Sequence, residues 1–204
     1  LYKCSMNKTK RKIFEASMKL FAEKGYDATS VEEITSVVGV AKGTLYYHFS
    51  SKEEIFYFLV EEGMKLLQNS IIIKTSQKSN SIEKLKSVVL IQLKILYKYQ
   101  DFVTILLSQM WGNEPRNKKC REYIKQYLNI IEGIVNDGIK NNELINANSE
   151  TIAIQIFSTT CVSLLYKSDK EYEININDTY KELENILFRG LLKDERKFYN
   201  GKKR

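Results

Sequence analysis

Residues 29–49 read TSVEEITSVVGVAKGTLYYHF, and this stretch decides the fold of the N-terminal quarter of the chain. Apolar residues recur at helical spacing on both sides of Gly39. Thr29 followed by Glu32 has the pattern of a capping box, so the first of two short helices is expected to begin here. Glycine tolerates the positive φ that a tight turn between helices requires. The stretch therefore predicts a helix-turn-helix whose inner positions are Ile34, Val38, Val40, Leu45 and Phe49.

The second short helix leaves an outer face that is rich in hydrogen-bond donors and contains no acid. Its members are Lys42, Gly43, Thr44, Tyr46, Tyr47 and His48. Donors without acids suit a groove lined by phosphates, and Lys52 adds a cation just beyond it. Taken singly, each residue also has an ordinary interpretation: either tyrosine could pack inward, His48 could be a surface or capping residue, and both lysines could be solvated.

Helical spacing also continues on both sides of this motif. Residues 8–24 carry one apolar face and end at Gly25, and Ser51 with Glu54 predicts the start of a long helix. A polar stretch over 74–81 and the segment 112–117, which holds the only proline, interrupt the pattern. We therefore expect an all-α protein with about nine helices, the later ones over 82–99, 101–111 and 118–140 and then beginning at caps Ser149 and Asn177.

Positive charge is concentrated at the two ends of the chain. The formal net charge is +7. Residues 1–52 hold nine lysines and arginines against five acids, and residues 193–204 hold six against two. This distribution favours a polyanionic partner for the N-terminal part. The default interpretation of the C-terminal run is a solvated basic tail.

Several classes of protein are disfavoured by what the sequence lacks. The three cysteines have no CxxC spacing, which suits a reducing cytoplasm, and Cys120 and Cys161 fall on apolar faces where we expect inert core residues. No apolar run is long enough to span a membrane. Paired carboxylates near a histidine, a glycine-rich phosphate loop and a metal cluster are all missing. The sequence thus predicts a cytoplasmic protein that is not an enzyme and needs no cofactor.

Residues 8–60 resemble the DNA-binding domain of the TetR family of bacterial regulators. The resemblance rests on Thr29, Glu32 and Ile34, and on the run GVAKGTLYYHF from Gly39 to Phe49 followed by Ser51, Lys52, Glu53 and Glu54. It implies that Lys42, Gly43 and Thr44 approach the bases, that Tyr46, Tyr47, His48 and Lys52 hold phosphates, and that Thr29 touches the DNA backbone. Ala41 departs from the family pattern, which often has serine or proline there.

The resemblance also implies a division of labour along the chain. A DNA-binding domain over 7–52 would precede a helical ligand-binding and dimerisation domain over 53–193 and a basic tail over 194–204. Residues 150–166 and 177–192 would form a homodimer, although their small residues also suit packing within one chain. Candidate pocket residues are Phe102, Leu106, Met110, Trp111, Tyr123, Tyr127, Phe157 and Cys161, for each of which plain core is the ordinary alternative.

Residues 127–145 are similar to TetR-type regulators of fatty-acid metabolism, whose effector is an acyl-coenzyme A. The expected function is therefore a repressor that binds a palindromic operator as a dimer and releases it when an acyl-CoA or another lipophilic compound binds. The alternative is a constitutive DNA-binding protein whose C-terminal domain only dimerises.

Overall fold

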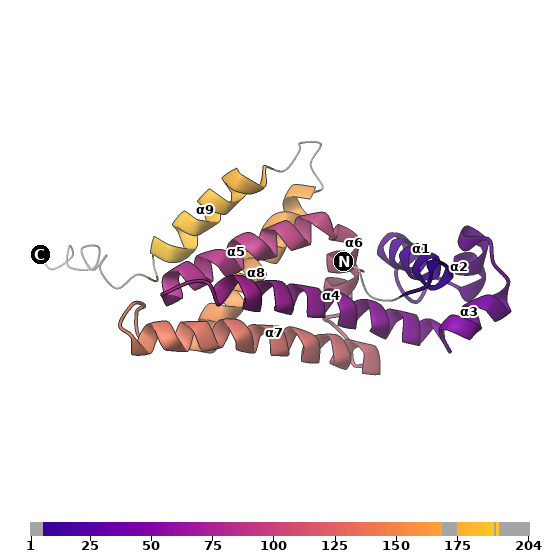
Figure 1. Cartoon of the computed structure of the whole chain (residues 1–204), viewed down its shortest axis with the longest axis horizontal. Helices are drawn as coiled ribbons and strands as arrows, with labels where there is room; N and C mark the ends of the chain where they lie inside the picture. Colours follow the sequence, from indigo (N-terminus) through magenta and orange to yellow (C-terminus); the bar gives the residue numbers. More distant parts are fainter. Residues whose placement is uncertain (1–5, 169–174, 190, 192–204) are drawn as a thin grey trace, which may run out of the picture. The chain divides into compact units, whose positions relative to one another are not determined.

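The computed structural model describes residues 6–168, 175–189 and 191, and this part of the chain forms nine α-helices without a β-strand (Figure 1). The predicted all-α fold is confirmed. The helices are α1 (Lys8–Lys24), α2 (Val31–Val38), α3 (Lys42–His48), α4 (Lys52–Thr75), α5 (Ser81–Lys98), α6 (Gln100–Ser108), α7 (Pro115–Lys140), α8 (Ser149–Ser168) and α9 (Ile176–Arg189). The predicted basic tail over 194–204 lies outside the described residues.

The chain divides into two compact units, and α4 and α7 each contribute to both. The first unit contains α1, α2, α3 and α6 together with α4 up to Leu66 and α7 up to Ile124. The second contains α5, α8 and α9 with the remaining parts of α4 and α7. The boundaries of these units differ from the division that we expected at residue 52. That division concerns function, and it stays a prediction.

Local signals set the ends of the helices in the first unit. The Asn7 side chain accepts a hydrogen bond from the Lys10 amide at 2.8 Å and so caps α1, which ends at Gly25 with φ 86°.

Inside the first unit, α6 packs against α1. Helix α6 also approaches α4 so closely that a Cβ atom on Gly63 would overlap the ring of Phe102. The glycine thus permits a helix contact that no larger residue would fit.

A buried polar group ties three helices together in the second unit. The Tyr127 hydroxyl of α7 donates to Oε1 of Gln92 on α5 at 2.7 Å. Nε2 of Gln92 in turn donates to the Phe157 carbonyl of α8 at 3.1 Å. Gln92 and Tyr127 are both fully buried, and each would lose stability if left unpaired. Mutual hydrogen bonding allows these polar side chains to lie inside an otherwise apolar core.

Three predicted helix caps are wrong by one or two residues, and the start of α7 also differs from the expected one. The structure caps α2 with Ser30, α8 with Asn148 and α9 with Asn175, where we expected Thr29, Ser149 and Asn177. The interruption predicted over 112–117 does separate α6 from α7, but Pro115 is already the first residue of α7, which we expected to begin at Lys118. Proline is well suited to that position because its missing N–H would have no partner inside the helix.

Candidate nucleic-acid interface

The turn between α2 and α3 has the geometry of a helix-turn-helix. Gly39 adopts φ 75° and ψ 39°, the left-handed conformation that glycine reaches without strain, and its amide donates to the Thr35 carbonyl at 2.9 Å. Ile34 and Leu45 are fully buried and Phe49 is 1% exposed, so they join both helices to the core of the first unit. The apolar inner face thereby fixes which side of α3 is turned outward.

The outward side of α3 carries the residues that the sequence singled out. Lys42, Gly43, Tyr46 and Tyr47 are exposed, and Thr44 and His48 are half-buried. Tyr46 is 47% exposed and Tyr47 84% exposed, so neither tyrosine packs inward. The Tyr47 ring meets the His48 ring edge-on with centroids 5.0 Å apart. The exposed Tyr47 ring, held against the half-buried His48 on a short helix, forms a surface able to meet another molecule.

Lys42 is not an isolated cation. Its ammonium group forms an ion pair with the carboxylate of Glu32 on α2. Hydrogen bonding between the two lowers the pKa of Glu32 and raises that of Lys42, so both groups are charged at neutral pH. Both side chains are more than half exposed. Glu32 therefore competes for the lysine with any phosphate that approaches α3.

Thr29 does not lie on this surface, which corrects its expected role. The side chain is 1% exposed, and its hydroxyl donates to the carbonyls of Gly25 at 2.8 Å and Leu20 at 3.3 Å. Ser30 and Glu33 form the capping box of α2 in its place. A hydrogen bond from Lys24 and two from Ser30 lower the pKa of Glu33 to about 2, which keeps this carboxylate charged as the cap requires.

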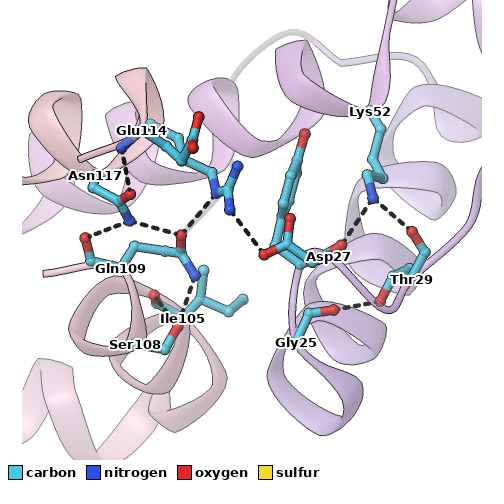
Figure 2. Close-up of polar contacts among 11 residues, drawn as sticks. Gly25, Asp27, Thr29, Lys52, Ile105, Ser108, Gln109, Glu114 and Asn117 are labelled. Atoms are coloured by element: carbon cyan, nitrogen blue, oxygen red, sulfur yellow. Dashed lines mark hydrogen bonds and ion pairs between the residues drawn. The ribbon is translucent and has the colours of Figure 1, made fainter. Parts of the chain in front are cut away.

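Lys52 also differs from its expected role as a phosphate-binding cation. Its ammonium group donates to the carbonyls of Tyr26 at 2.9 Å and Thr29 at 2.8 Å, and lies 4.3 Å from the centroid of the Tyr26 ring (Figure 2). These contacts turn the lysine inward, toward the segment that joins α1 to α2. Lys52 thus holds the helix-turn-helix together instead of extending its outer face.

The predicted pocket residues are distributed over both units. Phe102 and Leu106 are buried in the first unit, where Met110 and Tyr123 are half-buried. Tyr127, Phe157 and Cys161 are buried in the second, so these three can serve the core or a pocket. The expectation for Trp111 is corrected, because this residue is 83% exposed and lies in the segment that follows the end of α6 at Ser108. It does not line the interior.

The two cysteines within the described residues behave as the sequence predicts. Cys120 and Cys161 are buried and free. Burial raises the pKa of each thiol to about 12, so neither is a ready nucleophile. Within the described part of the chain, no group of three His, Cys, Asp or Glu side chains is arranged to hold a metal ion. None of the described helices is long and apolar enough to cross a membrane.

A polar cluster that no sequence pattern indicates joins residues far apart in the chain. Arg116, at the start of α7, donates to Asp27 in the segment between α1 and α2 at 2.8 Å and to Gln109 at 3.0 Å. Asp27 and Arg116 are 89 positions apart. No periodicity or spacing connects such a pair, and the bases after Pro115 look like an ordinary solvated helix start. The packing of α6 on α1 brings the end of α1, which Asp27 follows, close to the start of α7, where Arg116 lies.

Comparisons with known proteins agree with this geometry. The model of the family described as bacterial regulatory proteins, tetR family, matches residues 13–57. The fatty acid metabolism regulator protein of Bacillus subtilis (strain 168) is 30% identical over 166 residues, which are 79% of this chain and 86% of that protein. A Clostridium perfringens protein described as a fatty acid metabolism regulator has a similar structure, with 33% identity, a TM-score of 0.83, and coverage of 89% of this chain and 98% of that one.

A further solved structure carries a ligand. The transcriptional regulator FadR from Bacillus subtilis in complex with stearoyl-CoA aligns with a TM-score of 0.77 and 26% identity, over 88% of this chain and 98% of that one. The relatives named here are regulators, not enzymes.

Proposed function

Because this chain belongs to the TetR family of bacterial regulatory proteins, we propose that it is a ligand-responsive repressor that binds a palindromic operator as a homodimer. The observation that carries the proposal is the outer face of α3, which presents Lys42, Tyr46 and Tyr47 to solvent without an acid of its own. A helix of this kind fits the major groove, where phosphate contacts set the position and base edges set the sequence.

The dimer is supported by apolar side chains on the last two helices. Ile154 and Val162 of α8 are 45% and 61% exposed, and Ile186 of α9 is 70% exposed beside a shallow pocket shared with Glu182 and Asn185. Residues 150–166 and 177–192, as far as the structure describes them, therefore offer apolar surface to a second copy. A homodimer would carry two copies of α3, which suits an operator made of two symmetric half-sites.

The ion pair between Glu32 and Lys42 gives a test of DNA contact with effects of opposite sign. Lys42→Ala is expected to weaken binding to a random-sequence duplex and to reduce the slope of log affinity against log salt by about 1. Glu32→Gln is expected to strengthen binding, because it removes a competing carboxylate and leaves the Lys42 ammonium group free for phosphate. Fluorescence anisotropy titrations at a series of salt concentrations measure both.

The matched control is Lys78→Ala, which removes the same charge from an exposed position between α4 and α5. Equal salt slopes for Lys42→Ala and Lys78→Ala would show that Lys42 makes no phosphate contact. Weaker binding by Glu32→Gln would show that the ion pair orients α3 instead of competing with DNA.

We further propose an acyl-CoA as the effector. The Bacillus subtilis regulator that binds stearoyl-CoA supports this choice, as do the apolar side chains buried in both units of this chain. A ligand that binds only the folded protein, present at about 100 times its Kd, stabilises it by about 2.7 kcal/mol. For a protein of this size such a gain raises Tm by roughly 5–10 °C.

Thermal unfolding with stearoyl-CoA and with shorter acyl-CoAs measures this gain, and free coenzyme A and stearate serve as controls. The active acyl-CoA should also release the protein from DNA. Unchanged Tm across the series of chain lengths would favour the alternative in which the C-terminal helices only dimerise and DNA binding is constitutive.

A further inference from the structure

The segment between α1 and α2, residues 25–29, is held from two sides by cations. The Lys52 ammonium group and the Arg116 guanidinium group both lie over the Tyr26 ring, at 4.3 and 4.9 Å from its centroid. Lys52 belongs to the start of α4 and also binds two carbonyls of the segment (Figure 2). Arg116 belongs to the start of α7 and binds the Asp27 carboxylate. The entry to α2 is thus fixed from two separate helices.

The Arg116 side chain is itself fixed by the connection between α6 and α7. Its Nε donates to Oε1 of Gln109, which also accepts from Nδ2 of Asn117 at 3.1 Å. Asn117 is 4% exposed, and its Oδ1 accepts from the Glu114 amide at 3.1 Å (Figure 2). The Nε side of the guanidinium group therefore has a defined orientation, because Gln109 and Asn117 are buried and bonded to each other.

We propose that Arg116 is a positioning residue for DNA binding, which rests on the function proposed above. Together with Asp27, Tyr26 and Gln109 it forms what we call the Arg116 clasp, which holds residues 25–29 against the connection between α6 and α7. Ser30, the cap of α2, follows this segment directly. Since α2 and α3 share a buried core, a shift at Ser30 moves the outer face of α3 as well.

Loss of the clasp should change DNA affinity more than it changes the stability of the protein. The Asp27 side chain is 76% exposed, so solvent screens the charge pair and its contribution to overall stability is small. The clasp acts instead on the position of one short segment. Its loss should therefore lower affinity for a specific DNA sequence while leaving the unfolding temperature nearly unchanged.

Asp27→Ala gives the sharpest test, because two explanations predict opposite signs. Removing an acid from a DNA-binding unit strengthens binding if only net charge matters. The clasp predicts that Asp27→Ala binds about fivefold more weakly than the wild type to a duplex enriched by the wild type from a random pool. Its Tm should stay within about 2 °C of the wild-type value. Amides at residues 30–34 should exchange hydrogen faster than in the wild type.

Arg116→Gln and the double variant complete the test, with Lys118→Gln as the control that removes the same charge from an exposed site on the same turn. Arg116→Gln should lose at least as much affinity as Asp27→Ala. The double variant with both substitutions should lose no more affinity than Arg116→Gln alone, because both changes break the same contact. Lys118→Gln should lose less than twofold in affinity. Wild-type or tighter binding by Asp27→Ala, or equal losses for Arg116→Gln and Lys118→Gln, would overturn the clasp. A wild-type protein that enriches no duplex would instead refute the proposed function, and hydrogen exchange would still report whether the clasp holds α2.

Discussion

Replacing Gly63 by alanine is expected to lower the free energy of unfolding by about 1–3 kcal/mol. Alanine is the better helix former by up to about 1 kcal/mol, so propensity alone predicts the opposite sign. The added Cβ would overlap three atoms of the Phe102 ring, which is 1% exposed and has no room to move aside. Helices α4 and α6 would have to separate, and urea denaturation followed by circular dichroism measures the cost.

Gly133→Ala is the matched control, because Gly133 lies inside α7 and a Cβ atom added there would have no neighbour within 4 Å. Here only helix propensity acts, and the free energy of unfolding should rise by about 0.5–1 kcal/mol. If both variants shift the free energy of unfolding in the same direction, the close contact with Phe102 is not what prevents a larger residue at position 63.

Gly43→Ala should separate stability from function. Gly43 is exposed on α3 and nothing lies within 4 Å of an added Cβ, so the protein alone gives no reason for a glycine there. Alanine should stabilise the free protein by up to about 1 kcal/mol. If α3 enters the major groove, the same methyl group stands between helix and DNA. Affinity for an enriched duplex should then fall about tenfold or more, the equivalent of about 1.4 kcal/mol.

Anisotropy titrations with the enriched duplex measure that loss, and Gly133→Ala again provides the control for a methyl group added elsewhere. Unchanged affinity in Gly43→Ala would mean that this part of α3 does not approach DNA closely. A loss of stability together with affinity would point to local unfolding of α3 instead of a clash at the DNA surface.

The sequence predicted the helices well where one dominant signal acts. Gly25 and Gly39 both adopt positive φ at the predicted ends of α1 and α2, since few other residues reach that conformation cheaply. Helix starts were less certain because several residues in a row could cap. Between Thr29 and Ser30, burial decides: Thr29 is turned inward to bind the carbonyls of Leu20 and Gly25, which leaves Ser30 to cap α2.

The candidate site was predictable where it depends on one helix and not where it depends on distant segments. The exposed face of α3 follows from the positions of Leu45 and Phe49, which are read directly from helical spacing. Lys52 looks like a free cation in sequence, yet the carbonyls that bind it belong to Tyr26 and Thr29. Contacts between segments far apart in the chain produce no periodic pattern in the sequence. The Arg116 clasp joins the most distant of these segments.

Enrichment of DNA from a random-sequence pool by the wild-type protein tests most directly whether the outer face of α3 reads DNA. We expect the selected duplexes to share an inverted repeat with half-site centres about one helical turn apart, and expect binding to weaken steeply with salt. Recovery of no common sequence, or enrichment that persists unchanged when Lys42 and Tyr47 are both replaced by alanine, would contradict it.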